Sequence, residues 1–208
     1  MNKNSRVKAV ISLDAVEQNF REMRKNIAED TKMIAVVKAD AYGHGAVPIA
    51  HLIEKYDYIW GFAAATAEEA VHLRQNGVTK PILILGIVFE EYYPELVRDD
   101  IRLAVCEYEE AEKLSREAVL QNKTVHIHIA LDTGMTRIGY ADIPESVVKI
   151  EEISKIPNLV IEGMFTHFSR ADEYDRSPAM VQLERYQRFS ELVEKAGVKI
   201  PLHHCSNS

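Results

Sequence analysis

One stretch decides how the rest of this chain is interpreted: Met33-Ile34-Ala35-Val36-Val37-Lys38-Ala39-Asp40-Ala41-Tyr42-Gly43-His44-Gly45. Five apolar residues precede Lys38, which is typical of a parallel strand that is buried on both faces. The carboxyl end of such a strand is where α/β-barrel enzymes carry their active sites. Partial burial lowers the pKa of a lysine, and a neutral amine can form a Schiff base with an aldehyde. The alternative is that Lys38 extends into solvent and has no chemical role.

The sequence on both sides of this stretch alternates regularly between strand and helix patterns. After the strand at 33–37, strands are predicted at 58–63, 82–85, 101–105, 125–131, 159–165 and from 201 onward. Helices are predicted between them, at about 48–55, 67–75, 90–97, 108–120, 144–156 and 179–196. Regular alternation predicts a parallel sheet. Similar units with polar residues at several strand ends favour a (β/α)8 TIM-type barrel over a doubly wound open sheet.

The N-terminal segment precedes this repeat. Residues 9–13 are predicted to form a short strand, and Asp14 is predicted to cap the following helix, with Glu17 three residues later as in a capping box. The helix has an apolar stripe on one face. Residues 1–208 contain no linker and no second core, so the whole chain is expected to be one barrel domain.

Composition narrows the class of protein. The 208 residues are 47% hydrophobic and 27% charged, with a formal net charge of −7, so nucleic-acid binding is not expected. No apolar run approaches the ~20 residues of a membrane helix, and no signal-peptide pattern is present. The two cysteines, Cys106 and Cys205, lie far apart in sequence. A cytoplasmic protein is the simplest expectation.

The segment Val37–Gly45 resembles the cofactor-lysine motif of the alanine racemase family, whose members use pyridoxal 5′-phosphate (PLP). The resemblance implies that Lys38 binds the cofactor and acts as a proton-transfer base, that Tyr42 reaches the cofactor phosphate, and that Leu85 packs against the cofactor ring. Members of this family continue with an eighth barrel unit and a β-rich domain. The resemblance therefore implies a barrel truncated after its seventh strand, in a chain that is a fragment of the family pattern.

A second motif, Asp132-Thr133-Gly134-Met135-Thr136-Arg137-Ile138-Gly139, follows the predicted strand 125–131. A planar guanidinium at a strand end suits a phenolate or carboxylate, although a turn with a solvated arginine is equally compatible with this pattern. The motif resembles the second signature of the family, which implies that Arg137 binds the phenolic oxygen of the cofactor and helps to place the substrate carboxylate. Many members carry a lysine, carbamylated in some of them, where this chain has Ala130, so the brace for Arg137 is either missing or supplied by another group.

Histidines are the remaining candidates for chemistry. His126 and His128 share one face of their strand, and we expect barrel-core histidines without an acidic or histidine partner in register, not a metal pair. His203, His204 and Cys205 alternate in direction along a strand, so no metal site is expected there. By resemblance, His167 supports an arginine that binds the pyridine nitrogen and that would lie beyond residue 208. Ser208 would bind the cofactor phosphate.

The expected function is racemisation of L- and D-alanine, which supplies D-alanine for peptidoglycan, in a homodimeric parent protein. Racemisation needs a base on each face of the carbanion, and the resemblance implies that the second base is a tyrosine of the partner subunit. The chain by itself is therefore expected to be nearly inactive. Three alternatives remain open, namely a racemase for serine or another amino acid, a non-catalytic PLP-binding barrel protein, and a metal hydrolase.

Overall fold

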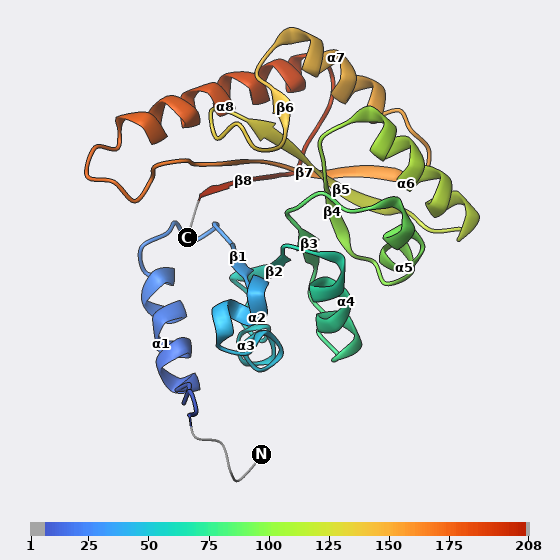
Figure 1. Cartoon of the computed structure of the whole chain (residues 1–208). Coiled ribbons are helices and arrows are strands. Elements are labelled where there is room, and N and C mark those ends of the chain that lie inside the picture. Colours follow the sequence, from blue (N-terminus) through green and yellow to red (C-terminus); the bar gives the residue numbers. More distant parts are fainter. Residues whose placement is uncertain (1–6, 207–208) are drawn as a thin grey trace.

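The computed structural model describes residues 7–206, which form an open, curved, parallel sheet with helices on its outer side (Figure 1). The strands are β1 (Met33–Val36), β2 (Ile59–Ala64), β3 (Ile82–Ile84), β4 (Arg102–Val105), β5 (Val125–Asp132), β6 (Tyr140–Ala141), β7 (Leu159–His167) and β8 (Leu202–Ser206). The helices are α1 (Leu13–Arg24), α2 (Lys38–Gly43), α3 (Ala46–Ile53), α4 (Ala67–Gln75), the 3-10 turn η1 (Glu90–Tyr92), α5 (Tyr93–Arg98), α6 (Tyr108–Leu120), α7 (Pro144–Ile153) and α8 (Ser177–Lys195).

The order of the strands in the sheet distinguishes between the two architectures that the sequence left open. Within the described residues the strands pair in the order β1-β2-β3-β4-β5-β7-β8, all parallel, and the short β6 pairs with β5 at the side. A doubly wound sheet would reverse its strand order at a switch point, whereas here each strand lies beside the next in the sequence. The chain therefore forms a seven-stranded half-barrel of the TIM type, which confirms the predicted fold class.

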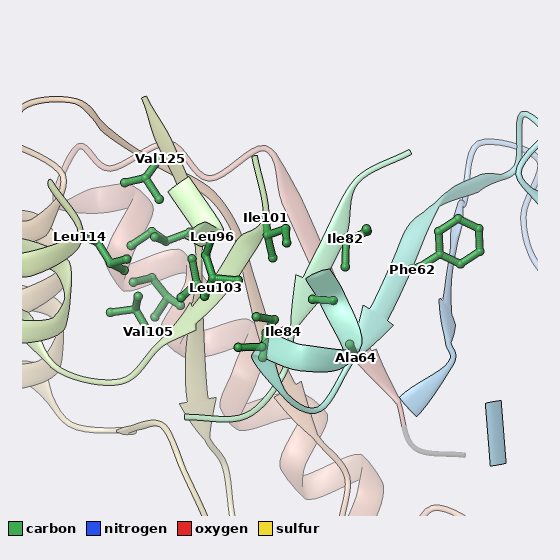
Figure 2. Packing of buried hydrophobic residues seen from close by; sticks show 14 of the residues in the cluster. Phe62, Ala64, Ile82, Ile84, Leu96, Ile101, Leu103, Val105, Leu114 and Val125 are labelled. Atoms are coloured by element: carbon green, nitrogen blue, oxygen red, sulfur yellow. The ribbon is translucent and has the colours of Figure 1, made fainter. Parts of the chain in front are cut away.

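The main core lies between the outer face of the sheet and the helices. Alternate residues of β5 face opposite sides, so that Ile127, Ile129 and Leu131 join this core while His128 and Ala130 point to the concave inner face. Figure 2 shows apolar side chains of successive strands packed together, with Leu96 of α5 and Leu114 of α6 against them. Each fully buried side chain of this size contributes roughly 1.5–3 kcal/mol. Burial of one set of side chains against the helices therefore fixes which residues point to the concave inner face.

The predicted strand at 9–13 and the predicted cap at Asp14 are both wrong. Residues 7–12 form no strand, and Val7 and Val10 are 84% and 79% exposed. Helix α1 begins at Leu13, and Ser12 is its N-cap, because the Ser12 hydroxyl accepts a hydrogen bond from the Ala15 N–H at 3.3 Å. A short apolar run produces a strand only where a neighbouring strand is available, and within residues 7–206 β1 pairs with β2 alone.

Most other predicted elements are confirmed, with small shifts at their ends. Helix α3 begins at Ala46, two residues before the predicted start at Pro48, because the Asp40 carboxylate accepts a hydrogen bond from the Ala46 N–H at 2.7 Å. The strand β6 was not predicted from the sequence. Within the described residues, no helix is long and apolar enough to span a bilayer.

Candidate active site

Lys38 follows β1 directly, and the backbone behind it has an unusual conformation. Ala39, Asp40, Ala41 and Tyr42 all have left-handed backbone angles, with φ between 50° and 56°. For non-glycine residues this conformation costs roughly 1–2 kcal/mol each. A strained turn of this length persists only where its surroundings hold it, and such turns gather at functional sites.

Two carboxylates hold this turn. Glu69, on α4, accepts hydrogen bonds from the Ala39 N–H at 2.7 Å and from the Ala65 N–H at 2.8 Å. It thereby joins the segments that follow β1 and β2. The Asp40 side chain caps α3, and the Asp40 carbonyl accepts a hydrogen bond from the Gly45 N–H at 2.9 Å. The backbone that carries Lys38 is therefore anchored on both sides.

Three of the predicted site residues lie at the same edge of the sheet. Lys38 follows β1, Arg137 lies in the loop after β5, and His167 is the last residue of β7. Burial lowers the pKa of His167, and the nearby cations of Arg137 and Lys38 lower it further. The carboxyl ends of parallel strands lie at one edge of the sheet, so residues from distant parts of the sequence meet where barrels carry their sites.

Tyr42 lies next to Lys38. The Lys38 Nζ is 5.9 Å from the centroid of the Tyr42 ring, within the range of a cation–π contact. Lys38 is half-buried, whereas Tyr42 is 51% exposed. The left-handed turn thus presents an amine and a phenol together at the rim of the sheet.

The loop that carries Arg137 is organised by its own acidic residue. The Asp132 carboxylate accepts hydrogen bonds from the N–H groups of Gly134 at 2.9 Å and Thr136 at 3.0 Å. Arg137 is exposed, and within residues 7–206 its guanidinium makes no hydrogen bond or ion pair. The position of Arg137 therefore depends on the backbone of this loop and not on a partner of its side chain.

One part of the inner face is an apolar cluster. Ala104, Ala130 and Phe165 form a buried cluster against which Leu85 and Cys106 pack. Ala130 is 2% exposed and has only apolar neighbours in this cluster, so position 130 supplies no anion for Arg137. The strands therefore carry an apolar cluster on the inner face, in addition to the cationic and phenolic groups near their carboxyl ends.

The expectation that His128 lacks an acidic or histidine partner is wrong. Its Nδ1 lies 2.7 Å from Nε2 of His204, and its Nε2 lies 3.3 Å from Oε2 of Glu162. Burial raises the pKa of Glu162, but hydrogen bonds from His128 and Arg102 outweigh this effect and lower it. Because an ionised Glu162 accepts the proton on Nε2 of His128, His204 donates to Nδ1 of His128.

The same network continues toward the opposite end of the sheet. Arg102 donates to Glu162 at 3.1 Å and to the Asp100 carboxylate at 2.7 Å, and Nδ1 of His126 lies 3.6 Å from Asp100. These partners come from β4, β7 and the segment before β4, so their register with β5 was not visible in the sequence. No group of three or more His, Cys, Asp or Glu side chains within residues 7–206 is arranged to hold a metal ion.

The last predicted residues lie on β8 or beyond it. His203 and His204 point to opposite faces as expected, since His203 contacts the Tyr186 hydroxyl at 2.9 Å while His204 stacks on Phe165 with ring centroids 4.9 Å apart. Ser208, the predicted phosphate ligand, lies outside the described residues.

Comparison with known proteins identifies the family. Residues 11–208 match the family model described as "Alanine racemase, N-terminal domain". The chain belongs to this family. It is 38% identical over 200 residues to alanine racemase 1 of Caldanaerobacter subterraneus subsp. tengcongensis, a match that covers 95% of this chain and 51% of the relative. The chain thus spans about half the length of the curated relatives that it matches.

Solved structures show the same relationship to alanine racemases. The structure of alanine racemase from Clostridium difficile 630 superimposes with a TM-score of 0.91 at 40% identity and covers 94% of this chain and 51% of that one. A histidine racemase from Leuconostoc mesenteroides superimposes with a TM-score of 0.83 at 28% identity, covering 94% of this chain and 51% of that one. The half-barrel is therefore shared by racemases named for different amino acids.

The residues present here fit the cofactor of the alanine racemase family, which is PLP. An aldehyde needs an amine, and Lys38 supplies one at the site edge. A phosphate and a phenolate need cationic or phenolic donors, which Arg137 and Tyr42 offer. A flat aromatic ring needs an apolar surface, which Leu85 and the cluster around Ala130 provide. The donor set and the apolar cluster of the inner face both suit such a group.

Reasoning from the sequence missed two side chains that shape this candidate site. Glu69 holds the turn behind Lys38, and it was predicted only as part of the helix 67–75, with no role at the site. Gln182, on α8, is 4% exposed and bonds to the segments after β5 and β7. A glutamine at a position where a helix faces the sheet is the signal that could have found it, because buried amides are almost always hydrogen-bonded.

Proposed function

We propose that this chain forms the PLP-binding half of an alanine racemase that interconverts L- and D-alanine. The observation that carries the proposal is that Lys38, Arg137 and His167 follow or end three parallel strands, β1, β5 and β7, and so share the carboxyl edge of the sheet. Relatives that are 38–41% identical to this chain carry the same name, which supports the substrate assignment.

Lys38 is the residue that we assign to proton transfer. PLP, when bound, supplies an electron sink for the carbanion that forms at the α-carbon of the amino acid. Lys38 holds the cofactor through Nζ and moves a proton at that atom on one face of the substrate. The turn at residues 39–42 fixes the lysine backbone, so that only the side chain has to move during proton transfer.

Arg137, Tyr42, Leu85 and His167 are assigned to binding and orientation. We assign Arg137 to the phenolic oxygen of the cofactor and the carboxylate of the substrate, Tyr42 to the phosphate, and Leu85 to the face of the ring. His167 is neutral near pH 7 because its pKa is lowered, and it adds no third cation beside Lys38 and Arg137. Its imidazole is free to accept a hydrogen bond from a guanidinium, which we assign to an arginine outside residues 7–206. Ser208 is assigned to the phosphate.

A second proton-transfer group is required on the opposite face of the substrate. We propose that it is a tyrosine of the partner subunit in a cytoplasmic homodimer whose D-alanine serves peptidoglycan synthesis. The 208 residues alone should then racemise alanine about 10²–10⁴-fold more slowly than a full-length relative, because they lack one general base.

Another amino-acid substrate is the second candidate. The similarity of this fold to a histidine racemase structure favours that class over a non-catalytic PLP-binding protein. The side chain of the substrate would meet residues outside the described part of the chain. The racemase assay described below should therefore compare alanine, serine and histidine as substrates.

The test combines covalent trapping with a racemase assay. PLP is added to the purified protein and reduced with borohydride, and the labelled peptide is mapped, which should place the cofactor on Lys38. Lys38→Arg should abolish the label. Lys32 is an exposed lysine just before the amino end of β1, and Lys32→Arg should retain the label.

The racemase assay uses the whole protein. D-alanine formed from L-alanine is measured by chiral chromatography, with serine and histidine as competitors. Labelling of a different lysine, or no racemisation of any amino acid, would contradict the proposal.

A further inference from the structure

The amide of Gln182 is at the centre of a buried junction. This residue lies in the second turn of α8, and only 4% of its surface is exposed. Its Oε1 accepts hydrogen bonds from the Ser169 N–H at 2.9 Å and the Ser169 hydroxyl at 3.0 Å. Its Nε2 donates to the Thr133 hydroxyl at 3.1 Å and to the His167 carbonyl at 3.2 Å. Both acceptor positions and both N–H donors of the amide are therefore used.

These bonds join two segments that carry site residues. Thr133 belongs to the loop of Arg137, whereas His167 and Ser169 belong to the end of β7. A further bond at 2.7 Å links the hydroxyls of Thr133 and Thr166. The two segments are thus connected through one helix side chain in a buried position, where each bond is strengthened by the low dielectric.

The Arg137 loop is also held to β7 by the Thr133–Thr166 bond and by the pairing of β5 with β7, and to α8 by a second side chain. Arg185, also on α8, donates to the Thr133 carbonyl at 3.1 Å. A Cβ at Gly134, whose φ is 141°, would lie 3.8 Å from the Gln182 side chain, so the loop backbone packs directly on it. The guanidinium of Arg137 has no partner within residues 7–206 that would correct its position if the loop moved.

We propose that Gln182 is a positioning residue that ties the Arg137 loop to the end of β7 and so fixes the separation between Arg137 and His167. Only the predicted effect on catalysis rests on the proposed function. The predicted effect on the position of the Arg137 loop concerns residues of this chain alone. A displacement of about 1 Å in a positioning group can reduce a rate by roughly 10²-fold.

Two variants remove different parts of the junction. Gln182→Leu keeps the approximate volume and removes all four bonds. Gln182→Glu keeps the acceptors for Ser169 but removes the two N–H donors to Thr133 and His167. The matched control is Gln187→Leu, because Gln187 lies on the same helix but is exposed.

Two measurements are made without added cofactor. Hydrogen exchange of the Gly134 and Thr136 amides should speed up by at least 10-fold in both Gln182 variants and remain unchanged in Gln187→Leu. The pKa of His167, followed by NMR, should rise toward its ordinary value as Arg137 moves away, a change that general destabilisation would not produce. If Gln182→Leu fails to fold, Thr133→Val gives the same two readouts, because it removes the Thr133 hydroxyl and with it the bonds to Gln182 and Thr166.

The catalytic consequence is measured separately in the whole protein. Both Gln182 variants should lower kcat/KM for alanine by about 10–100-fold while reduced PLP still labels Lys38. Unchanged amide exchange and an unchanged His167 pKa in the folded variants would overturn the inference, whatever their activity. If no variant or wild-type protein racemises alanine but the two cofactor-free readouts shift, the proposed function is wrong and the positioning role of Gln182 is retained.

Discussion

Substitution of Gly163 by alanine should destabilise the half-barrel through one specific clash. Gly163 lies on β7 beside His128 of β5, and a Cβ at this position would come within 2.5 Å of Nδ1 and 2.6 Å of Cε1 of the His128 ring. The ring is fully buried and is held at both nitrogens, at 2.7 Å from His204 and 3.3 Å from Glu162. It cannot move aside without losing at least one of these contacts.

The magnitude follows from three contributions. Overpacking of a dense core costs roughly 1–3 kcal/mol. A buried polar group that loses its hydrogen bond costs roughly another 1–3 kcal/mol. The lower entropy of the unfolded chain with alanine offsets roughly 0.4–1 kcal/mol of this cost. We therefore expect Gly163→Ala to lower the free energy of unfolding by about 3 kcal/mol.

Urea unfolding measures this loss, and the chain supplies its own probe. Trp60 is the single tryptophan, and its ring centroid is 5.5 Å from that of His128, so its fluorescence reports on this part of the inner face. With a urea dependence of roughly 3 kcal/mol per molar, the midpoint should fall by about 1 M. The slope of the free energy of unfolding against urea concentration should not change, because the same surface is exposed on unfolding.

The control is the same substitution in a His128→Ala background. Without the imidazole ring the new methyl group has no clash, so Gly163→Ala should then change the free energy of unfolding by less than about 0.5 kcal/mol. The coupling between the two sites should be about 2–3 kcal/mol. Equal destabilisation in both backgrounds would show that His128 is not the group that excludes a side chain at position 163.

Three further predictions concern stability and backbone conformation. Burial and the neighbouring His128 lower the pKa of His204 to about 3, so the unfolded chain binds a proton below pH ~6.5 that the folded chain does not. The free energy of unfolding should therefore be about 1–2 kcal/mol lower at pH 5 than at neutral pH, and it should stop falling below pH 3. In His204→Phe, urea titrations should show a smaller dependence of this free energy on pH. Ser12→Ala removes the α1 cap and should cost about 1 kcal/mol; an unchanged thermal midpoint would argue against Ser12 as the cap. Thr136→Gly relieves a β-branched residue at φ 55° and should stabilise by about 0.5–1 kcal/mol, whereas a lower midpoint would show that the loop is not strained there.

The sequence by itself determined the alternation of strands and helices, and with it the fold. The apolar run before Lys38 and the alternating residues of β5 encode burial locally, because the period of a strand depends only on its own residues. Parallel strands must end at one edge, so the sequence also predicted that Lys38, Arg137 and His167 would lie together. Residues 9–13 show the limit of this reasoning, since the apolar run there has no strand to pair with within residues 7–206.

The tertiary structure alone decided how these residues are held. Glu69 contacts Ala39 across 30 positions, and Gln182 contacts Thr133 across 49. The pairing of His128 with His204 spans 76 residues and depends on the register of β5, β7 and β8. Such contacts follow from which strand pairs with which and in what register, and no local pattern of residue types encodes this. A shift of one residue in register would turn every inner side chain outward, so the polar partners of this site are determined only once the whole sheet has formed.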